Sequence, residues 1–314
     1  LLIKHRNIKT LYSDLIKIQF WSLYLEYKLK RIKPKVVFLV TFYSPESYAL
    51  ILACQKLKIP TVDIQHGLLG DMHFAYNYWH KIPSYGFDLL PNYFWVWSTE
   101  EENCIKKWSS QLKFNSHQPF VGGNLWIYFW KEKERLFHKY EKKLIEISKI
   151  KNPKVKILLC MQHTWMKYHF FNDFLKKSPK DWFWYVRLHP TMKNQKNDVE
   201  QAFQSYGVNY NIQEATETSL LTLFRVVDLN ITYISSVMIE AEAFGIKSIF
   251  IDPLAIECFP TQIKNNNALY ADSAEKIIEL VGKIMNEKSQ ETDKTKIFDY
   301  QKVFQDFWNL IKHE

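Results

Sequence analysis

The sequence has few cysteines, and none are arranged to bind zinc or to form a framework of disulfides. Its four cysteines are scattered along the chain, and no CxxC pair occurs. Cys54 and Cys160 lie in apolar segments that we expect to be buried. This usage is typical of a reduced, cytoplasmic protein without structural disulfides or zinc.

Long hydrophobic runs are missing as well. No stretch reaches the roughly 18 consecutive apolar residues of a membrane span, so we expect no transmembrane helix. No signal peptide is visible. The chain begins with Leu1 rather than Met, and we therefore expect that its native N-terminus lies upstream.

Several catalytic motifs are also absent. The chain contains no GxGxxG, Walker loop or HExxH, and the lack of GxSxG argues against an esterase. No Asp-x-Asp pair occurs, although glycosyl transfer from a metal-bound diphosphate commonly needs carboxylate ligands for Mg²⁺ or Mn²⁺. We therefore expect no metal site and no bound cofactor, and expect protein groups to neutralise a leaving phosphate.

What is present points to two α/β domains. The chain has 314 residues, of which 47% are hydrophobic, enough for a sizeable core. Short apolar runs alternate with amphipathic stretches, and this predicts parallel sheets with connecting helices. The break at Lys151-Asn152-Pro153 predicts one domain over residues 1–150 and a second over 151–314. Within the second, residues 297–312 form a closing helix with Phe304, Trp308 and Ile311 at helical spacing.

The positive charge is concentrated at the N-terminal end. The net charge of the chain is +9, and residues 1–35 contain nine basic and two acidic residues. A helix predicted over residues 10–32 carries aromatic side chains among these charges. This combination indicates contact with anionic lipid or with nucleic acid, and the alternative is a solvated helix face.

In the second half, two serines follow a predicted strand. The sequence DLNITYISSVMIEAEAFG is typical of a strand, a tight turn and a helix. The hydroxyls of Ser235 and Ser236, with the backbone N–H groups of a helix N-terminus, would bind an anion such as a nucleotide phosphate. The alternative is that Ser235 only caps the helix. Glu240, one turn later, favours the functional interpretation.

A second candidate is the end of the strand before Pro190. Pro190 stops that strand and fixes the turn, which would hold His189 at the edge of the sheet. There His189 could bind a phosphate oxygen or protonate a leaving phosphate. Arg187 lies two residues earlier and should face the same side. The alternative is a histidine satisfied by the local backbone.

The first half offers a candidate base. Gln65-His66-Gly67 ends a predicted strand, and His66 could remove a proton from an acceptor hydroxyl. Asp71 is a rival base, whereas Asp63 is interpreted as structural. The aromatic segment over residues 71–92 could stack on sugar rings, and the alternative is packing against the other domain. The residues that we assign to acceptor binding are Gln65, Tyr76 and Trp79.

The order strand–QHG … HP … SSxxxEAxxxG over residues 36–260 resembles bacterial GT-B glycosyltransferases of capsule, lipopolysaccharide and teichoic-acid assembly. These include the Kdo transferases, the polysialyltransferases and, more distantly, the CDP-glycerol glycerophosphotransferases. The resemblance implies two Rossmann-like domains facing each other across a cleft, with the last helix packing back on the first. It also implies that His189, Ser235 and Ser236 bind the donor phosphate, that Glu240 holds the ribose or the nucleotide, and that Gln162 lines the donor pocket.

Three hypotheses follow. The first is a metal-independent glycosyltransferase that moves a sugar from a nucleotide donor, CMP-linked by resemblance, to a glycan or lipid-linked glycan. Residues 1–35 would hold it at the anionic inner face of the membrane. The second is a nucleotide-sugar epimerase of the same fold. The third is a non-enzymatic glycan- or nucleic-acid-binding protein. Nucleic acid is not expected, because the basic cluster and the aromatic segment are separate.

Overall fold

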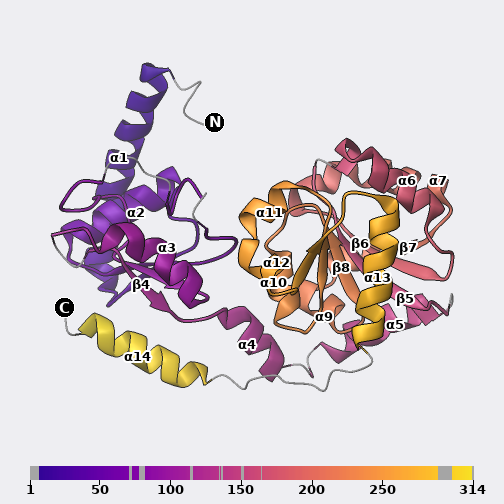
Figure 1. The fold of residues 1–314 in the computed structure, drawn as a ribbon. Coiled ribbons are helices and arrows are strands. Elements are labelled where there is room, and N and C mark those ends of the chain that lie inside the picture. The colour runs from indigo at the N-terminus through magenta and orange to yellow at the C-terminus, as the bar shows by residue number, and fades with distance from the viewer. Residues whose placement is uncertain are drawn as a thin grey trace. The chain divides into compact units, whose positions relative to one another are not determined.

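The chain folds into two compact α/β units, which the computed structural model describes over residues 7–70, 73–77, 82–113, 116–133, 135, 137–149, 152–163, 165–288 and 299–312 (Figure 1). Unit 1 comprises Leu1–Leu125 and Phe298–Glu314, and unit 2 comprises Trp126–Ile297. Within these described ranges, no helix is both long enough and apolar enough to cross a membrane.

Unit 1 is built on a four-stranded parallel sheet in the order β1-β2-β3-β4. All four residues of β3 are buried, as expected for a parallel strand covered on both faces. The strands are β1 (Val37–Leu39), β2 (Thr61–Ile64), β3 (Tyr93–Val96) and β4 (Gln118–Val121), and the helices are α1 (Ile8–Ile32), α2 (Pro45–Lys56), α3 (Thr99–Ser109) and α14 (Tyr300–Lys312).

The two faces of this sheet are covered by segments from opposite ends of the chain. Phe94 of β3 packs with Trp108 of α3 on one face. Its neighbour Trp95 points to the other face, because side chains alternate along a strand, and contacts Phe307 of α14. Phe307 and Ile311 are the buried residues of α14. The predicted return of the last helix to the first unit is therefore confirmed.

Unit 2 is built on a six-stranded parallel sheet in the order β10-β9-β8-β5-β6-β7. The chain moves outward from β5 through β6 to β7, then returns to place β8 on the other side of β5. The point between β5 and β8 is a topological switch point, where open α/β sheets bind ligands. The strands are β5 (Val155–Cys160), β6 (Trp182–Arg187), β7 (Asn209–Asn211), β8 (Leu229–Thr232), β9 (Ser248–Phe250) and β10 (Ala268–Tyr270).

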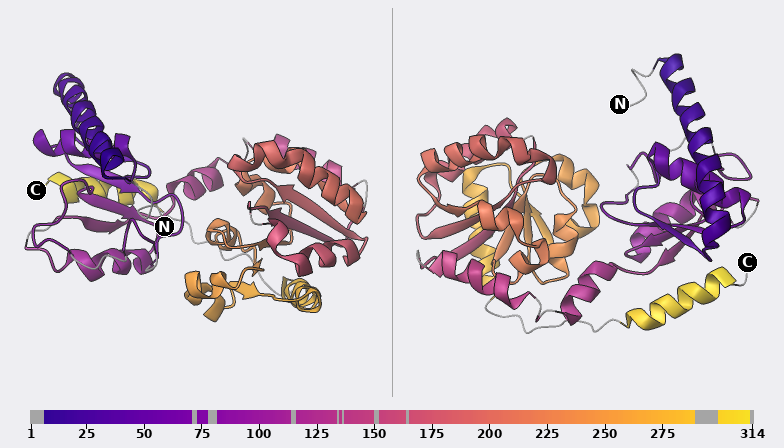
Figure 2. Two further views of the ribbon diagram at one scale, coloured as in Figure 1. Left: turned by 90° about the horizontal axis from the view of Figure 1, so that it is seen from above. Right: turned by 180° about the vertical axis from the view of Figure 1, so that it is seen from behind.

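Helices cover both faces of the second sheet, as Figure 2 shows. Trp184 packs toward Phe171 of α6 and Phe174 of the same helix, whereas Phe183 belongs to the opposite cluster. The helices of unit 2 are α4 (Leu125–Glu132), α5 (His138–Lys149), α6 (His169–Lys177), α7 (Lys196–Tyr206), α8 (Gln213–Glu217), α9 (Leu220–Phe224), α10 (Val237–Glu242), α11 (Leu254–Cys258), α12 (Pro260–Lys264) and α13 (Ala274–Lys288), with 3-10 turns η2 (Trp165–Lys167) and η3 (Pro190–Gln195).

The two parallel sheets confirm the predicted α/β class, but the units divide elsewhere than predicted. The division falls between Leu125 and Trp126 rather than between residues 150 and 151. The reason is packing: Trp130 of α4 and Leu144 of α5 are fully buried in the core of unit 2. Residues 298–314 also belong to unit 1 rather than to the second domain.

Candidate functional site

The switch point of unit 2 is held together by the side chain of Gln162. Its Nε2 donates to the carbonyl of Ile234 at 2.6 Å, and its Oε1 accepts from the Ile234 N–H at 3.3 Å. Gln162 follows β5 and Ile234 follows β8, so this double hydrogen bond fixes the spacing between the two strand ends. The residue predicted to line a donor pocket therefore lies at the switch point, with both ends of its amide already bonded.

A chain of hydrogen bonds crosses the ends of β5 and β6. Nε2 of Gln195 lies 3.0 Å from Nδ1 of His163, and Nε2 of His163 lies 2.5 Å from Oγ1 of Thr191. The same Oγ1 lies 2.7 Å from Nδ1 of His189, which also accepts from the Thr191 N–H at 3.3 Å. Four side chains from two segments are thus linked in one series.

The donors at both ends of the series fix its direction. A backbone N–H can only donate, so Nδ1 of His189 is an acceptor and a neutral ring carries its proton on Nε2. The amide nitrogen of Gln195 likewise donates to Nδ1 of His163, which places the proton of that ring on Nε2, facing Thr191. Thr191 then accepts from His163 and donates to His189. Within the described residues, Nε2 of the exposed His189 has no hydrogen-bond partner, so it can donate to an incoming anion.

Pro190 and Arg187 both make local contacts that hold this region in place. Pro190 occupies the first position of η3, with His189 as its N-cap. Nη1 of Arg187 donates to the carbonyls of Ala215 at 2.9 Å, Thr216 at 3.3 Å and Thr218. Burial lowers the pKa of its guanidinium. Nη1 of Arg187 is thus bonded to backbone carbonyls at and just after α8, and the phosphate contact of Arg187 stays a prediction.

The two serines after β8 differ in their surroundings. Oγ of Ser235 accepts from the N–H of Val237 at 3.3 Å and so takes the capping role. Ser236 is the N-cap residue of α10, but its side chain makes no capping hydrogen bond. Its hydroxyl is therefore the better candidate for a ligand contact. Burial raises the pKa of Glu240 to about 7, and the positive charge of Arg187 opposes that rise.

In unit 1, a buried carboxylate holds the loop after β1. Oδ1 of Asp63 accepts from the N–H of Phe42 at 3.0 Å, and Oδ2 accepts from the hydroxyl of Tyr76 at 2.7 Å. Burial raises the pKa of Asp63 to about 6. Thr41, next to the anchored Phe42, has a φ of 68°, a left-handed conformation that is a genuine outlier for a β-branched residue. Strain of this kind gathers at functional sites.

His66 faces this strained loop. Its Nε2 lies 3.3 Å from Oγ1 of Thr41 and 3.4 Å from the hydroxyl of Tyr43. Both contacts are long, so an acceptor hydroxyl could displace them. The ring is accessible to solvent, yet desolvation by the surrounding protein lowers its pKa. A histidine with a lowered pKa is neutral at pH 7 and can accept a proton. His73 stacks on the exposed Phe74, and its own pKa is lowered by burial and by the charge of the nearby His66.

The structure describes two of the three residues that were predicted to bind the acceptor. Gln65 is buried: its Nε2 donates to the carbonyl of Gly67 at 2.9 Å, and its Oε1 accepts from the N–H of Trp97 at 2.8 Å. Tyr76 is buried as well, with its hydroxyl on Asp63. Both are corrected to structural roles, because their polar atoms are used inside unit 1. Asp71 and Trp79 lie outside the described residues.

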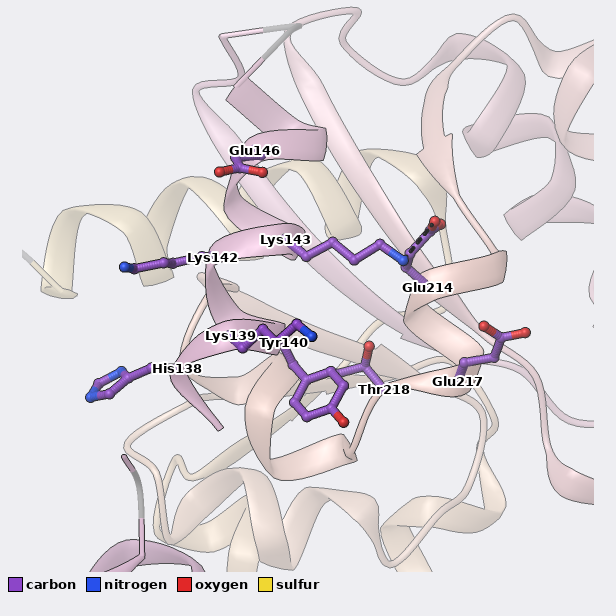
Figure 3. Close-up of a pocket in the computed structure, with 9 residues that line it drawn as sticks. All are labelled: His138, Lys139, Tyr140, Lys142, Lys143, Glu146, Glu214, Glu217 and Thr218. Atoms are coloured by element: carbon purple, nitrogen blue, oxygen red, sulfur yellow. Dashed lines mark ion pairs between the residues drawn. The ribbon is translucent and has the colours of Figure 1, made fainter. Parts of the chain in front are cut away.

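A pocket of about 740 Å³ lies elsewhere on unit 2, between α5 and α8 (Figure 3). Lys143 and Glu214 form an ion pair across it at 3.5 Å. Its lining holds charges of both signs and none of the predicted site residues: His138, Lys139, Tyr140, Lys142, Lys143, Glu146, Glu214, Glu217 and Thr218. In the described part of the chain, no three His, Cys, Asp or Glu side chains gather as metal ligands would.

Comparison with known proteins gives matches in structure but not in sequence. No protein-family model matches the chain, and no curated protein matches its sequence. A UDP-GlcNAc 2-epimerase from Neisseria meningitidis bound to UDP-GlcNAc is 15% identical, with a TM-score of 0.63 over 94% of this chain and 81% of that chain. The UDP-GlcNAc 2-epimerase of Methanocaldococcus jannaschii, in complex with UDP-GlcNAc and UDP, is 16% identical, with a TM-score of 0.61 over 95% and 81%.

A third similar structure is HepE of Anabaena in complex with UDP and glucose. It is 11% identical, with a TM-score of 0.55 over 92% of this chain and 81% of that chain. At these identities the likeness concerns the fold, and it agrees with the two α/β units on parallel sheets that the sequence predicted.

Proposed function

We propose that this protein is a metal-independent glycosyltransferase that moves a sugar from a nucleotide-activated donor to a bacterial surface glycan. The observation that carries the proposal is the directed series from Gln195 through His163 and Thr191 to His189, across the ends of β5 and β6 and beside the switch point of unit 2. It supplies an imidazole N–H donor where parallel α/β sheets bind phosphates. A CMP-linked donor is the first candidate, from the resemblance to Kdo transferases and polysialyltransferases.

In the proposed reaction, unit 2 binds the donor nucleotide and unit 1 the acceptor. His66 accepts the proton of the acceptor hydroxyl, whose oxygen forms a bond to the anomeric carbon. The bond between that carbon and the donor phosphate breaks, and the nucleotide leaves with the electron pair. The N–H of His189 and the hydroxyl of Ser236 donate to the phosphate as its negative charge grows. No metal enters this scheme.

The second candidate is a nucleotide-sugar epimerase, which the similarity to UDP-GlcNAc 2-epimerases supports to a comparable degree. Epimerisation at a carbon requires proton transfer on both faces of the sugar, whereas attack by a hydroxyl needs one base. Among the described residues near the ends of β1 and β2, the carboxylates of Asp63 and Glu101 already accept hydrogen bonds within unit 1. Of the two histidines described there, His66 is exposed, whereas Nδ1 of His73 already accepts from the N–H of Ala75 at 3.2 Å. His66 is therefore the more available base, and one base is what transfer requires.

The test is nucleotide binding without metal. Thermal shifts are measured in EDTA with CMP, CDP, UMP, UDP, GDP and dTDP, for wild type, His189→Ala and the control His138→Ala, which removes a histidine outside the switch point. We expect one nucleotide to raise the melting temperature. The loss of a hydrogen bond to a charged phosphate, about 1.5–3 kcal/mol, should weaken binding roughly 10- to 100-fold in His189→Ala only.

Incubation with the matching nucleotide sugar alone then separates the candidates. An epimerase changes the configuration of the sugar without an acceptor, which NMR of the donor would detect, whereas a transferase leaves it intact. If no nucleotide shifts the melting temperature, the proposal of a nucleotide-activated donor is wrong. If His189→Ala binds the nucleotide as well as wild type, the donor site does not include His189.

A further inference from the structure

Helix α1 has two apolar faces, although it packs on unit 1 through only one. Leu29 of α1 packs against Ala53 and Cys54 of α2. Ile18 and Ser22 are the other buried residues of α1. Figures 1 and 2 show α1 extending beyond the rest of unit 1 at its N-terminal end. Most of its surface therefore faces away from the core of this unit.

The second apolar face runs along the exposed side of α1. Its five residues are spaced by four, four, three and four positions, which places them on one side of a helix. Each is at least half exposed, from 53% to 68%. Single exposed apolar residues are ordinary, but a continuous stripe of aromatic and aliphatic side chains marks an interaction surface. We call this set the α1 stripe: Tyr12, Ile16, Phe20, Leu23 and Tyr27.

A basic depression lies at the C-terminal end of the same helix. It has a volume of about 440 Å³, and its lining includes four lysines and no acidic residue. Lys33 and Lys58 both adopt left-handed conformations, with φ of 53° and 57°, where glycine would be the usual residue. The turns at the ends of α1 and α2 thus present lysines despite a conformational cost. The lysine depression is formed by Lys30, Lys33, Lys35 and Lys58.

The stripe and the depression are continuous. Leu23 and Lys30 are seven residues apart and lie on the same side of α1. At the junction, Tyr27 lies under the guanidinium of Arg31, and its hydroxyl accepts from Nη1 at 3.1 Å. Lys30 is paired with Glu26 at 2.7 Å, yet basic residues outnumber acidic ones along α1 and the depression. An apolar stripe that leads into a lysine cluster matches a surface with acyl chains beside phosphates.

We propose that the α1 stripe and the lysine depression form a docking surface for a bilayer that contains anionic lipid. The stripe enters the boundary between headgroups and acyl chains, and the lysines bind lipid phosphates. A second copy of the chain fits less well, because it would bring two helices with excess positive charge together. The lysine depression lies where β1 and β2 begin, whereas His66 follows the carboxyl end of β2, so the inference goes beyond the proposed catalytic function.

The test is vesicle co-sedimentation of the full chain. Vesicles of phosphatidylcholine alone are compared with vesicles that also contain phosphatidylglycerol, at low and high salt. One variant carries Phe20→Ser and Leu23→Ser, and another carries Lys33→Glu and Lys58→Glu. Matched controls change exposed residues elsewhere: Leu254→Ser with Ile278→Ser, and Lys107→Glu with Lys113→Glu. Circular dichroism and the melting temperature verify that each variant is folded.

We expect wild type to bind the anionic vesicles and to be released by salt. Each lysine charge near an anionic surface contributes about fivefold to binding, so the lysine variant should bind at least roughly 25-fold more weakly. The stripe variant should lose binding by at least about tenfold, and both controls should match wild type.

Equal binding to neutral and anionic vesicles, or no binding to either, would overturn the proposal. Release of the protein from the vesicles by inorganic phosphate, at a concentration matching the lipid phosphate, would also overturn it and would identify a site for free anions. A dimer in analytical ultracentrifugation that the stripe variant abolishes would assign the surface to a second copy. Nucleotide thermal shifts do not depend on this surface, so a failure here is distinguishable from a failure of the donor site.

Discussion

The buried carboxyl group of Asp63 gives the fold of unit 1 a pH dependence of unusual sign. Asp63 is 1% exposed, and its burial raises the pKa from an ordinary 3.8 to about 6. The hydrogen bonds from Phe42 and Tyr76 favour the charged form but do not offset the cost of desolvation. Replacing Asp63 by Asn keeps the shape of the side chain and removes its ionisation.

The sign follows from which state holds the proton more tightly. Between pH 4 and pH 6 the folded chain keeps the Asp63 carboxyl protonated, whereas the unfolded chain has released that proton. The contribution of Asp63 to stability is therefore present below the unfolded pKa and is lost as the pH rises through about 6. A shift of about two units corresponds to about 3 kcal/mol, and above pH 7 the difference stays constant.

The assay is urea denaturation monitored by tryptophan fluorescence at a series of pH values from 4 to 8, since Trp95 and Trp108 are buried in unit 1. The free energy of unfolding of wild type minus that of Asp63→Asn should fall by about 3 kcal/mol from pH 4 to pH 7. The exposed control Asp272→Asn should give a flat difference. A difference that rises with pH would mean that the fold stabilises the charged carboxylate, and the reasoning would be wrong.

Three further predictions concern the strand ends. Arg187→Met should lower the free energy of unfolding of unit 2 by about 3 kcal/mol, because the carbonyl of Thr218 and its neighbours lose their donor; an unchanged urea midpoint would contradict this. Thr41→Gly should raise stability by about 1–2 kcal/mol through relief of the left-handed conformation, yet slow turnover because His66 loses a hydroxyl neighbour. In wild type the melting temperature of unit 2 should decline as the pH rises from 5 to 8, because burial raises the pKa of Glu240 to about 7. Glu240→Gln should lack this decline, and an equal decline in both proteins would refute the assignment.

The alternation of short apolar runs with amphipathic stretches was enough to predict both sheets. The strand over residues 155–160 is buried throughout except for Lys156, and such a run is a signal within the sequence itself. The run does not reveal which strands lie beside it in the sheet, because the pairing with β8 depends on where a later segment returns. The sequence therefore located the polar strand ends but not which of them meet.

The roles of individual site residues were harder to predict than their positions. Gln65 was placed correctly at a strand end, but its amide oxygen accepts a hydrogen bond from the N–H of Trp97, thirty-two residues later in the chain. His163 was recognised at a strand end but was given no role, although its Nε2 lies 2.5 Å from Oγ1 of Thr191, which follows the neighbouring strand. The signal was available: two histidines after adjacent strands, one of them followed by Pro-Thr. The division of the units was missed because it depends on packing, and a break such as Lys151-Asn152-Pro153 separates elements without separating cores.

The return of α14 to unit 1 has a consequence for synthesis of the chain. The ribosome completes the four strands of unit 1 before unit 2, but the helix that covers Trp95 and Phe120 is translated only after all of unit 2. Until then one face of the first sheet exposes aromatic surface, a species that aggregates readily. Termination before α14 should therefore affect solubility more than a deletion of the same length elsewhere, and a chaperone that shields aromatic surface would act on the nascent chain during translation of residues 126–297.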